Sequence, residues 1–214
     1  MPTPTACRPF KPAEVPKLME AFDSRYADRN RALLSLGICT GFRISELLSL
    51  TIEDVYERGE IKDTIRIPKR MMKGKRSRSP KKIYPEAKEY LNKWINYMRM
   101  NMQTSTRSWL FASHKGGVIG PVTCYQIIND AARKAGISTE GVGTHSMRKT
   151  FANAVYDYWD EQQRAGERIE PMRMTQIELG HASIEDTYSY MEFKMEDKPD
   201  TVFAKYNLPS TETK

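Results

Sequence analysis

The sequence is poor in the features that mark secreted, disulfide-rich and membrane-spanning proteins. Its 214 residues include only three cysteines, Cys7, Cys39 and Cys124, which are too scattered for a zinc site or a disulfide framework. The longest nearly apolar run, residues 32–42, is far too short to cross a membrane, and no charged-then-apolar signal peptide opens the chain. We therefore expect a cytoplasmic protein with ordinary thiols and no membrane partner.

Two common devices for handling phosphate are missing as well. Gly74-Lys75 lacks the glycine-spaced context of a nucleotide-binding phosphate loop. The Asp and Glu residues do not cluster as they do in metal-dependent nucleases. We accordingly expect no cofactor and no bound metal.

Positive charge is in excess, and it is unevenly placed. The formal net charge is +7. Residues 151–214 carry 7 basic and 13 acidic residues, whereas residues 1–150 carry 27 basic and 14 acidic ones. A basic body with an acidic C-terminal part suggests a polyanionic partner for the body. On charge alone, a solvated basic surface explains the pattern equally well.

Basic residues are densest in residues 69–82, called the basic run below. This run contains no acid and eight Lys or Arg residues, namely Lys69, Arg70, Lys73, Lys75, Arg76, Arg78, Lys81 and Lys82. Such a run is usually a solvated loop. Here, however, it lies in a part of the chain that is patterned as strands, which leaves a binding role open.

Apolar residues recur at helical spacing along most of the chain. Helices are predicted near residues 15–22, 33–38, 43–48, 85–102, 122–132, 144–158, 171–179 and 183–190. Short stretches rich in β-branched or aromatic residues, 53–56 and 64–67, predict strands with Gly59 between them. The expected fold class is α+β, mainly helical, with a small antiparallel sheet or β-hairpin.

The two ends of the chain differ from its middle. Residues 1–10 contain three prolines and predict a flexible lead-in, and residues 11–193 suit a single domain with ample length for a core. Residues 194–214 form a tail that is too short for a domain and too apolar for a purely solvating segment. Its apolar residues are Val202, Phe203, Tyr206 and Leu208.

One predicted helix starts with a histidine and an arginine on the same face. Thr144 is a good N-cap, so His145 and Arg148 would lie one turn apart. Salt-bridged surface helices produce His-x-x-Arg pairs constantly. The pair alone is therefore weak evidence for a functional site.

A second histidine is predicted to emerge from a helix end. A helix that starts at Pro171 would end at Gly180, because glycine suits the left-handed C-terminal cap. The backbone would then fix the position of His181. A further helix follows and carries Tyr188 and Tyr190 on different faces. A Leu-Gly-His tripeptide alone is again an ordinary helix stop.

Three separated motifs stand out together. They are residues 40–47 (T-G-F-R-I-S-E-L), residues 145–148 (H-S-M-R), and residues 179–181 (L-G-H) with Tyr190 nine positions after the histidine. In this order they resemble the signature of the tyrosine recombinases, the phage-integrase family. The resemblance covers about residues 11–193 and implies the fold of that family's catalytic domain.

The resemblance implies a catalytic set made of Arg43, Lys73, His145, Arg148, His181 and Tyr190. The two arginines would clamp the scissile phosphate, because a planar guanidinium binds two phosphate oxygens at once. The two histidines would donate hydrogen bonds or move protons. Tyr190 would be the nucleophile that forms a 3′-phosphotyrosyl bond, and Lys73 the acid that protonates the leaving 5′ oxygen.

Two of these assignments have a competitor. Lys75 competes with Lys73, whose surroundings are more similar to the family's lysine pattern. Tyr188 competes with Tyr190, which is favoured because it follows a threonine, Thr187, by three residues as the family's tyrosine does.

The resemblance also implies partners. Double-stranded DNA would be bound through Lys69, Arg70, Lys75, Arg76, Arg78, Lys81 and Lys82. The protein would act as a homo-oligomer, a tetramer on two DNA sites, with the tail packed on a neighbouring subunit or on its own. Breaking and rejoining would need neither metal nor ATP, because the phosphotyrosyl bond stores the bond energy. A prokaryotic or phage origin fits this activity.

Two alternatives remain. A type IB topoisomerase-like enzyme uses a similar constellation to relax supercoils, although the T-G-x-R and L-G-H contexts favour a recombinase. The other alternative is a non-catalytic DNA-binding regulator on the same scaffold. The chemically competent residues at all six predicted catalytic positions argue against it.

Overall fold

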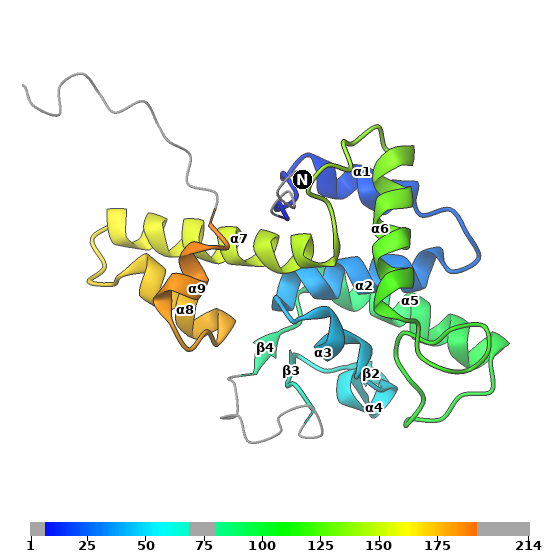
Figure 1. Cartoon of the computed structure of the whole chain (residues 1–214). Coiled ribbons are helices and arrows are strands. Elements are labelled where there is room, and N and C mark those ends of the chain that lie inside the picture. The colour runs from blue at the N-terminus through cyan, green and yellow to red at the C-terminus, as the bar shows by residue number, and fades with distance from the viewer. Residues whose placement is uncertain (1–6, 69–79, 192–214) are drawn as a thin grey trace, which may run out of the picture.

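A computed structural model describes residues 7–68 and 80–191 of the chain (Figure 1). The fold is mainly helical with two small antiparallel strand pairs, which confirms the predicted α+β class. In chain order the elements are α1 (Glu14–Ala21), α2 (Ala27–Thr40), α3 (Ile44–Leu48), α4 (Ile52–Val55), β1 (Tyr56–Glu57), β2 (Glu60–Ile61), β3 (Thr64–Ile65), β4 (Lys81–Lys82), α5 (Pro85–Asn101), α6 (Pro121–Lys134), α7 (Thr144–Arg164), α8 (Pro171–Leu179) and α9 (Ile184–Tyr188).

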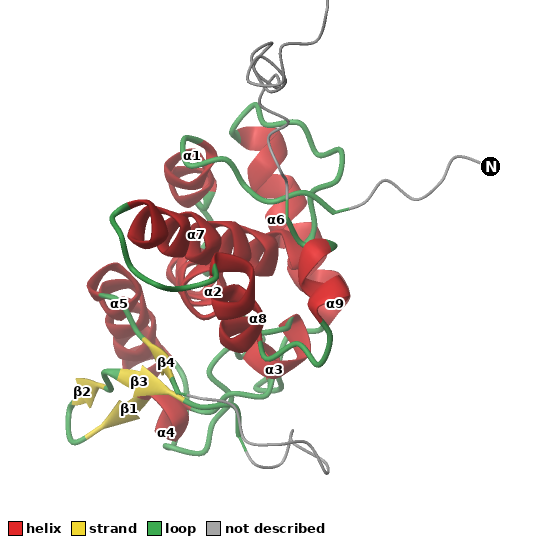
Figure 2. Cartoon of the chain, turned by 90° about the vertical axis from the view of Figure 1, so that its left-hand side faces the viewer, coloured by secondary structure: helices red, strands yellow, loops and turns green. Residues whose placement is uncertain are grey.

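Helix α2 is the centre of the main hydrophobic core. It packs against both α5 and α7, and Figure 2 shows it in the middle of the helices. All of its residues from Ala32 to Gly37 are buried, as expected for a helix that is enclosed on nearly all sides. Gly37 allows a close approach, because a Cβ there would lie 2.5 Å from the sulfur of Met147 on α7. The start of α7 is thereby fixed against the core.

The strands are short and pair in two separate antiparallel ladders. In the first, Tyr56 lies opposite Ile61; in the second, Thr64 lies opposite Lys82 and Ile65 opposite Lys81. The prediction of a small antiparallel sheet or β-hairpin is confirmed in this form.

The strand predicted at residues 53–56 is wrong for most of its length. Residues 52–55 form the short helix α4, and only the last predicted position begins β1. The cause is local: the backbone N–H and the hydroxyl of Thr51 both donate to the Asp54 carboxylate, at 2.8 and 2.9 Å. This capping arrangement stabilises a helical turn where the residue types favour a strand.

The described part of the predicted lead-in is packed on the domain. The backbone N–H of Arg8 donates to the carbonyl of Gly141 at 2.8 Å, and Phe10 is buried. The backbone N–H of Phe10 donates to the Thr150 hydroxyl at 2.8 Å. Residues 7–10 are therefore part of the fold and not of a flexible lead-in; residues 1–6 lie outside the described residues.

The molecule has two regions, which we call the body (residues 7–68 and 80–152) and the outer arm (residues 153–191). Helix α7 belongs to both: its first part packs on α2, and its second part extends outward with α8 and α9 beside it (Figure 1). The polar segment that follows residue 159 extends α7 to Arg164, beyond the predicted helix near residues 144–158. A small hydrophobic cluster of Phe151, Ala152 and Leu179 joins the two regions.

Candidate active site

Helix α7 begins at Thr144, one residue earlier than the predicted N-cap at Thr144 implies. Gly143 is the N-cap, and its backbone N–H donates to the Ser146 hydroxyl at 3.1 Å. The chain around Gly143 is buried, and a side chain on this residue would contact the ring of Tyr125. The shift by one position leaves His145 and Arg148 on the same side of the first helical turn, with His145 exposed and Arg148 buried.

Arg148 joins the body to the outer arm. Its side chain is 2% exposed, and its Nη1 donates to the carbonyl of Gly41 at the end of α2. Its Nη2 lies 2.9 Å from the carbonyl of Leu179 and 2.9 Å from Nε2 of His181. The Arg148 guanidinium, from the motif at residues 145–148, thus bonds to both other motifs, residues 40–47 and residues 179–181.

The hydrogen bonds of His181 define its tautomer. A guanidinium can only donate, so Nε2 of His181 accepts from Arg148. Nδ1 then carries the proton and donates to the Thr187 hydroxyl at 3.1 Å. Gly180 precedes the histidine with φ 62°, as predicted for a left-handed cap, and the backbone N–H of His181 donates to the Gln176 carbonyl at 3.1 Å. The ring is therefore fixed from both sides.

Tyr190 lies in the turn after α9, against these groups. Its ring centroid is 4.9 Å from that of His181, 5.6 Å from Cζ of Arg148 and 6.0 Å from Nζ of Lys149. Asn153 of α7 donates to the carbonyl of Tyr190 at 3.1 Å and fixes the backbone there. Two cations beside one phenol ring create a positive surrounding for it. Tyr188, the predicted competitor, is 51% exposed on the last turn of α9.

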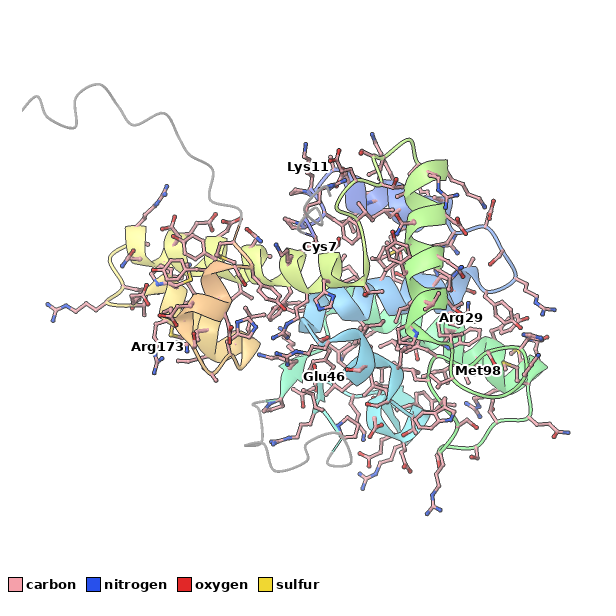
Figure 3. All side chains as sticks on the ribbon, viewed as in Figure 1. Cys7, Lys11, Arg29, Glu46, Met98 and Arg173 are labelled. Carbon is pink, nitrogen blue, oxygen red and sulfur yellow. The ribbon has the colours of Figure 1, made fainter. Side chains whose placement is uncertain are left out.

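Arg43 is held on a short, buried helix of the body. It is the N-cap of α3, and its backbone N–H donates to the carboxylate of Glu46 at 2.7 Å. The same carboxylate pairs with Nη1 of Arg43 at 3.4 Å, while the arginine side chain stays partly exposed. Figure 3 shows Glu46 on the body and Arg173 on the outer arm.

The left-handed turn at Gly41 places this motif beside α7. Gly41 has φ 62° and ends α2, and any side chain on it would overlap the ring of Phe151. The turn directs its carbonyl to Arg148 and leads directly into Arg43. This is the structural reason for a glycine in the T-G-F-R motif.

The charges around His145 show that the predicted residues share one neighbourhood. His145 is exposed overall, yet partial desolvation of its ring lowers its pKa below the usual value of 6.5. The positive charges of Arg148, Arg43 and Lys149 lower the pKa further, in that order. Arg43, Arg148 and Lys149 therefore make the surroundings of His145 positive, which can stabilise an anion.

Lys149 was not among the sequence-predicted site residues. It contacts the Tyr190 ring and also acts electrostatically on His145. Its distance of four residues from His145, which places both on one helix face, was the available clue.

Most of the basic run lies outside the described residues, namely Lys69, Arg70, Lys73, Lys75, Arg76 and Arg78. Lys82 is exposed, as a DNA contact would be, with Nζ 5.3 Å from the Tyr84 ring. For Lys81 the structure gives a different place from the predicted one. Its side chain lies on the inner face of β4, where it is buried and ion-paired with Glu178 of α8.

Two negative findings concern only residues 7–68 and 80–191. Within them, no three His, Cys, Asp or Glu side chains are grouped so that they could hold a metal ion. No helix in these ranges has both the length and the apolarity needed to cross a membrane.

Comparison with known proteins identifies the family. The model of the phage integrase family matches residues 8–197. The chain belongs to the phage integrase family. This match confirms the resemblance to a tyrosine recombinase catalytic domain that was inferred from the sequence.

Several tyrosine recombinases are similar to the chain in sequence. Tyrosine recombinase XerA of Pyrococcus furiosus is 32% identical over 180 residues, covering 83% of this chain and 54% of that protein. Tyrosine recombinase XerD of Mycobacterium tuberculosis (strain CDC 1551 / Oshkosh) is 28% identical over 167 residues, covering 76% and 47% respectively. The chain therefore spans about half the length of the curated relatives it matches.

Solved structures agree on the fold. A crystal structure of XerA recombinase superposes with a TM-score of 0.67 and 25% identity, covering 98% of this chain and 66% of that chain. XerH site-specific recombinase bound to its difH substrate gives 0.66 and 25%, covering 90% and 52%. A lambda integrase dimer bound to a COC′ core site, at 19% identity, shares the fold with a TM-score of 0.61.

Proposed function

We propose that this chain is the catalytic domain of a site-specific DNA recombinase of the integrase type, which breaks and rejoins DNA through a 3′-phosphotyrosyl intermediate without metal or ATP. The observation that carries the proposal is the position of Tyr190, whose ring contacts His181, Arg148 and Lys149. A phenol with a pKa of about 10 needs such a positive surrounding or a base to attack at neutral pH.

The chemical step assigns a role to each group. The Tyr190 hydroxyl releases its proton to solvent and its oxygen bonds to phosphorus, the bond from phosphorus to the 5′ oxygen breaks, and the Lys73 ammonium protonates that leaving oxygen and becomes a neutral amine. Arg43, Lys149 and His145 are partly or fully exposed and offer donors to the phosphate oxygens as negative charge develops. Rejoining reverses the step, because the 5′ hydroxyl attacks the phosphotyrosine and releases the phenol.

Arg148 has a particular place in this scheme. Its side chain is buried, and both Nη atoms already donate to carbonyls or to His181. It therefore contributes positive charge to the site and orients His181. In its burial it differs from Arg43, which is partly exposed.

The proposed partner is double-stranded DNA, bound in part through the basic run. The proposed location is the cytoplasm of a prokaryote, with the protein encoded by the prokaryote or by a phage. Solved relatives described as bound to a difH substrate or to a COC′ core site support this choice. The basic body of the chain fits a polyanion. We further propose a homo-oligomer, a tetramer on two DNA sites.

The tail is proposed to join neighbouring subunits. An apolar cleft of about 520 Å³ opens between β4 and α7, with Val155, Tyr158 and Trp159 in its lining. The apolar residues of 194–214 would fill such a cleft on an adjacent subunit. Deleting residues 196–214 should leave binding to a single DNA site intact and impair pairing and strand exchange between two sites. A truncated protein that recombines paired sites at the full rate would contradict this role.

The central test is a covalent adduct. The full chain is incubated with a nicked duplex, and the products are run on a denaturing gel. The wild type and Tyr188→Phe should form a protein–DNA adduct, and Tyr190→Phe should bind DNA but form none. Loss of the adduct in Tyr188→Phe alone would make Tyr188 the nucleophile. Absence of any adduct in the wild type would favour the non-catalytic regulator.

One further assay separates the recombinase from the topoisomerase-like alternative. A topoisomerase-like enzyme would relax a supercoiled plasmid that carries no paired sites. A recombinase should instead exchange strands between two copies of its site, and excess EDTA should not prevent adduct formation. Complete loss of the adduct on chelation would contradict the metal-free mechanism.

A further inference from the structure

Lys81 is a buried lysine at the boundary between the body and the outer arm. It is 6% exposed, and lysine is almost never buried to this degree without a charged partner. Nζ of Lys81 is ion-paired with the carboxylate of Glu178 and lies 5.5 Å from the centroid of the Phe151 ring. Lys81 therefore connects β4 with both α7 and α8.

Glu178 lies in the last turn of α8, next to the residues that build the site. The carbonyl of the following residue, Leu179, accepts from Arg148, and His181 comes two residues later. Glu178 itself remains 37% exposed along its side chain. A constraint on its carboxylate acts on the whole final turn, and so on the Gly180 cap that directs His181.

Arg148 and an apolar cluster also hold the outer arm to the body. The apolar cluster at its base consists of Phe151, Ala152 and Leu179, with some partly buried neighbours. The Lys81–Glu178 pair approaches α8 from β4, whereas Arg148 approaches it from α7. Two contacts from different elements fix the direction of a helix better than one can.

We propose that Lys81 and Glu178 form a positioning pair that holds the last turn of α8, and with it His181, against Arg148. The inference rests on the proposed function of the site, since its effect is on phosphodiester cleavage. A displacement of about 1 Å at reacting groups can cost about a hundredfold in rate. A buried ion pair is in general weak evidence for stability, because desolvation offsets much of the attraction.

Cleavage kinetics test the proposal in the full chain. Single-turnover adduct formation on a nicked duplex is measured at saturating protein, together with the Kd for the same duplex. Glu178→Gln and Lys81→Met should each slow cleavage by about 10- to 100-fold and leave Kd within about twofold. The double variant should be no slower than the slower single variant, because both substitutions remove one interaction.

An exposed ion pair supplies the matched control. Lys93 and Glu89 pair on the surface of α5, with both side chains more than half exposed. Lys93→Met, Glu89→Gln and their double variant should cleave at the wild-type rate. A second readout needs no activity: the ¹⁵N shifts of the His181 ring should change in Glu178→Gln and stay the same in Glu89→Gln.

Each other outcome overturns the pair's role. If the variants only lower the thermal midpoint and cleave at the normal rate well below it, the pair is merely structural. If Kd rises and the saturated rate is unchanged, Lys81 is a DNA contact. If the rate reductions of the single variants multiply in the double variant, the two residues act independently. A wild type that forms no adduct disproves the proposed function itself, and the ¹⁵N readout still decides whether the pair positions His181.

Discussion

The body and the outer arm are held together in different ways. The body has a continuous apolar core that includes Leu33, Trp94 and Phe111, so its shape is set by close packing. The arm meets the body at a small apolar cluster and is also tied to it by hydrogen bonds from Arg148 and by the ion pair of Lys81. Arg43 and His145 belong to the first region, and His181 and Tyr190 to the second. The site is therefore completed by polar contacts, which are sensitive to charge and to single substitutions.

Removing the guanidinium that joins the two regions should have the largest effect. Arg148→Ala should slow cleavage of a nicked duplex by about 10²–10³-fold, as for loss of one oxyanion-stabilising donor. It also leaves the carbonyls of Gly41 and Leu179 without this donor. Hydrogen exchange in α8 and α9 should therefore become faster, which mass spectrometry can measure.

Arg164→Ala is the control for this experiment. Arg164 lies on the exposed end of α7 in the arm and pairs with Asp160 at 2.9 Å. The Arg164→Ala variant should cleave the nicked duplex at the wild-type rate and show wild-type hydrogen exchange in α8 and α9. Wild-type cleavage by Arg148→Ala would show that the arm is placed without Arg148.

The second prediction concerns the charge of the body. Replacing Lys69, Arg70 and Lys82 with Ala should flatten the dependence of log K on log salt by about 0.9 for each phosphate that these side chains neutralise in the wild type. Lys81→Met should leave this slope unchanged, because its ammonium is paired inside the protein. Binding is measured by fluorescence anisotropy over a salt series.

A triple variant of the same charge change serves as the comparison. Lys93, Lys134 and Arg164 are exposed and paired with surface carboxylates. Their replacement by Ala should leave the salt slope unchanged. Equal flattening in both triples would mean that net charge, and not the basic run, governs binding.

A smaller effect is expected from the hydrogen bond that holds the nucleophile's backbone. Asn153 donates to the carbonyls of Tyr190 and Lys149, at 3.1 and 2.8 Å. Asn153→Ala should slow adduct formation roughly fivefold, since a neutral hydrogen bond contributes about 1 kcal/mol. Asn101→Ala is the control, because Asn101 donates to the carbonyl of Tyr97 at 2.9 Å within α5, a helix that carries none of the predicted catalytic residues. Equal rates in both variants would show that Tyr190 is positioned without Asn153.

The smallest effect is a pH dependence within the body. Desolvation and then the charges of Arg148, Arg43 and Lys149 hold the pKa of His145 below 6.5. As pH falls below 6.5, the unfolded chain takes up this proton first, so the folded state loses stability until the pH passes the folded pKa. His145→Gln should remove that contribution. Denaturant unfolding at about pH 7.5 and about pH 5.5 measures it, and identical pH dependence in both proteins would contradict it.

The sequence predicted the helices and the central motifs because their determinants are local. Proline at residue 171 and glycine at residue 180 set the ends of α8, and periodic apolar residues define α2 and α5. The grouping of Arg148, His181 and Tyr190 followed from a family pattern, and the structure brings these three together. The role of Lys73 remains a prediction.

What the sequence did not indicate depends on contacts between distant residues or on details of capping. Lys81 and Glu178 are separated by 97 positions, and nothing local shows that the lysine turns inward. A strand of two residues has no alternation to read. The helix α4 arises from the bonds between Thr51 and Asp54, which outweigh the strand preference of the residues around them.

Helix α7 is continuous and carries side chains of both regions, so the number of residues between these side chains is itself constrained. His145 and Arg148 lie near its start and Asn153 lies farther along, so the helical repeat alone sets the angle between them. Inserting a single residue between positions 149 and 153 would rotate the outer arm by about 100° and move it by about 1.5 Å relative to the body. Related chains can exchange side chains along this stretch, but a change in its length would separate the nucleophile from the charges that activate it.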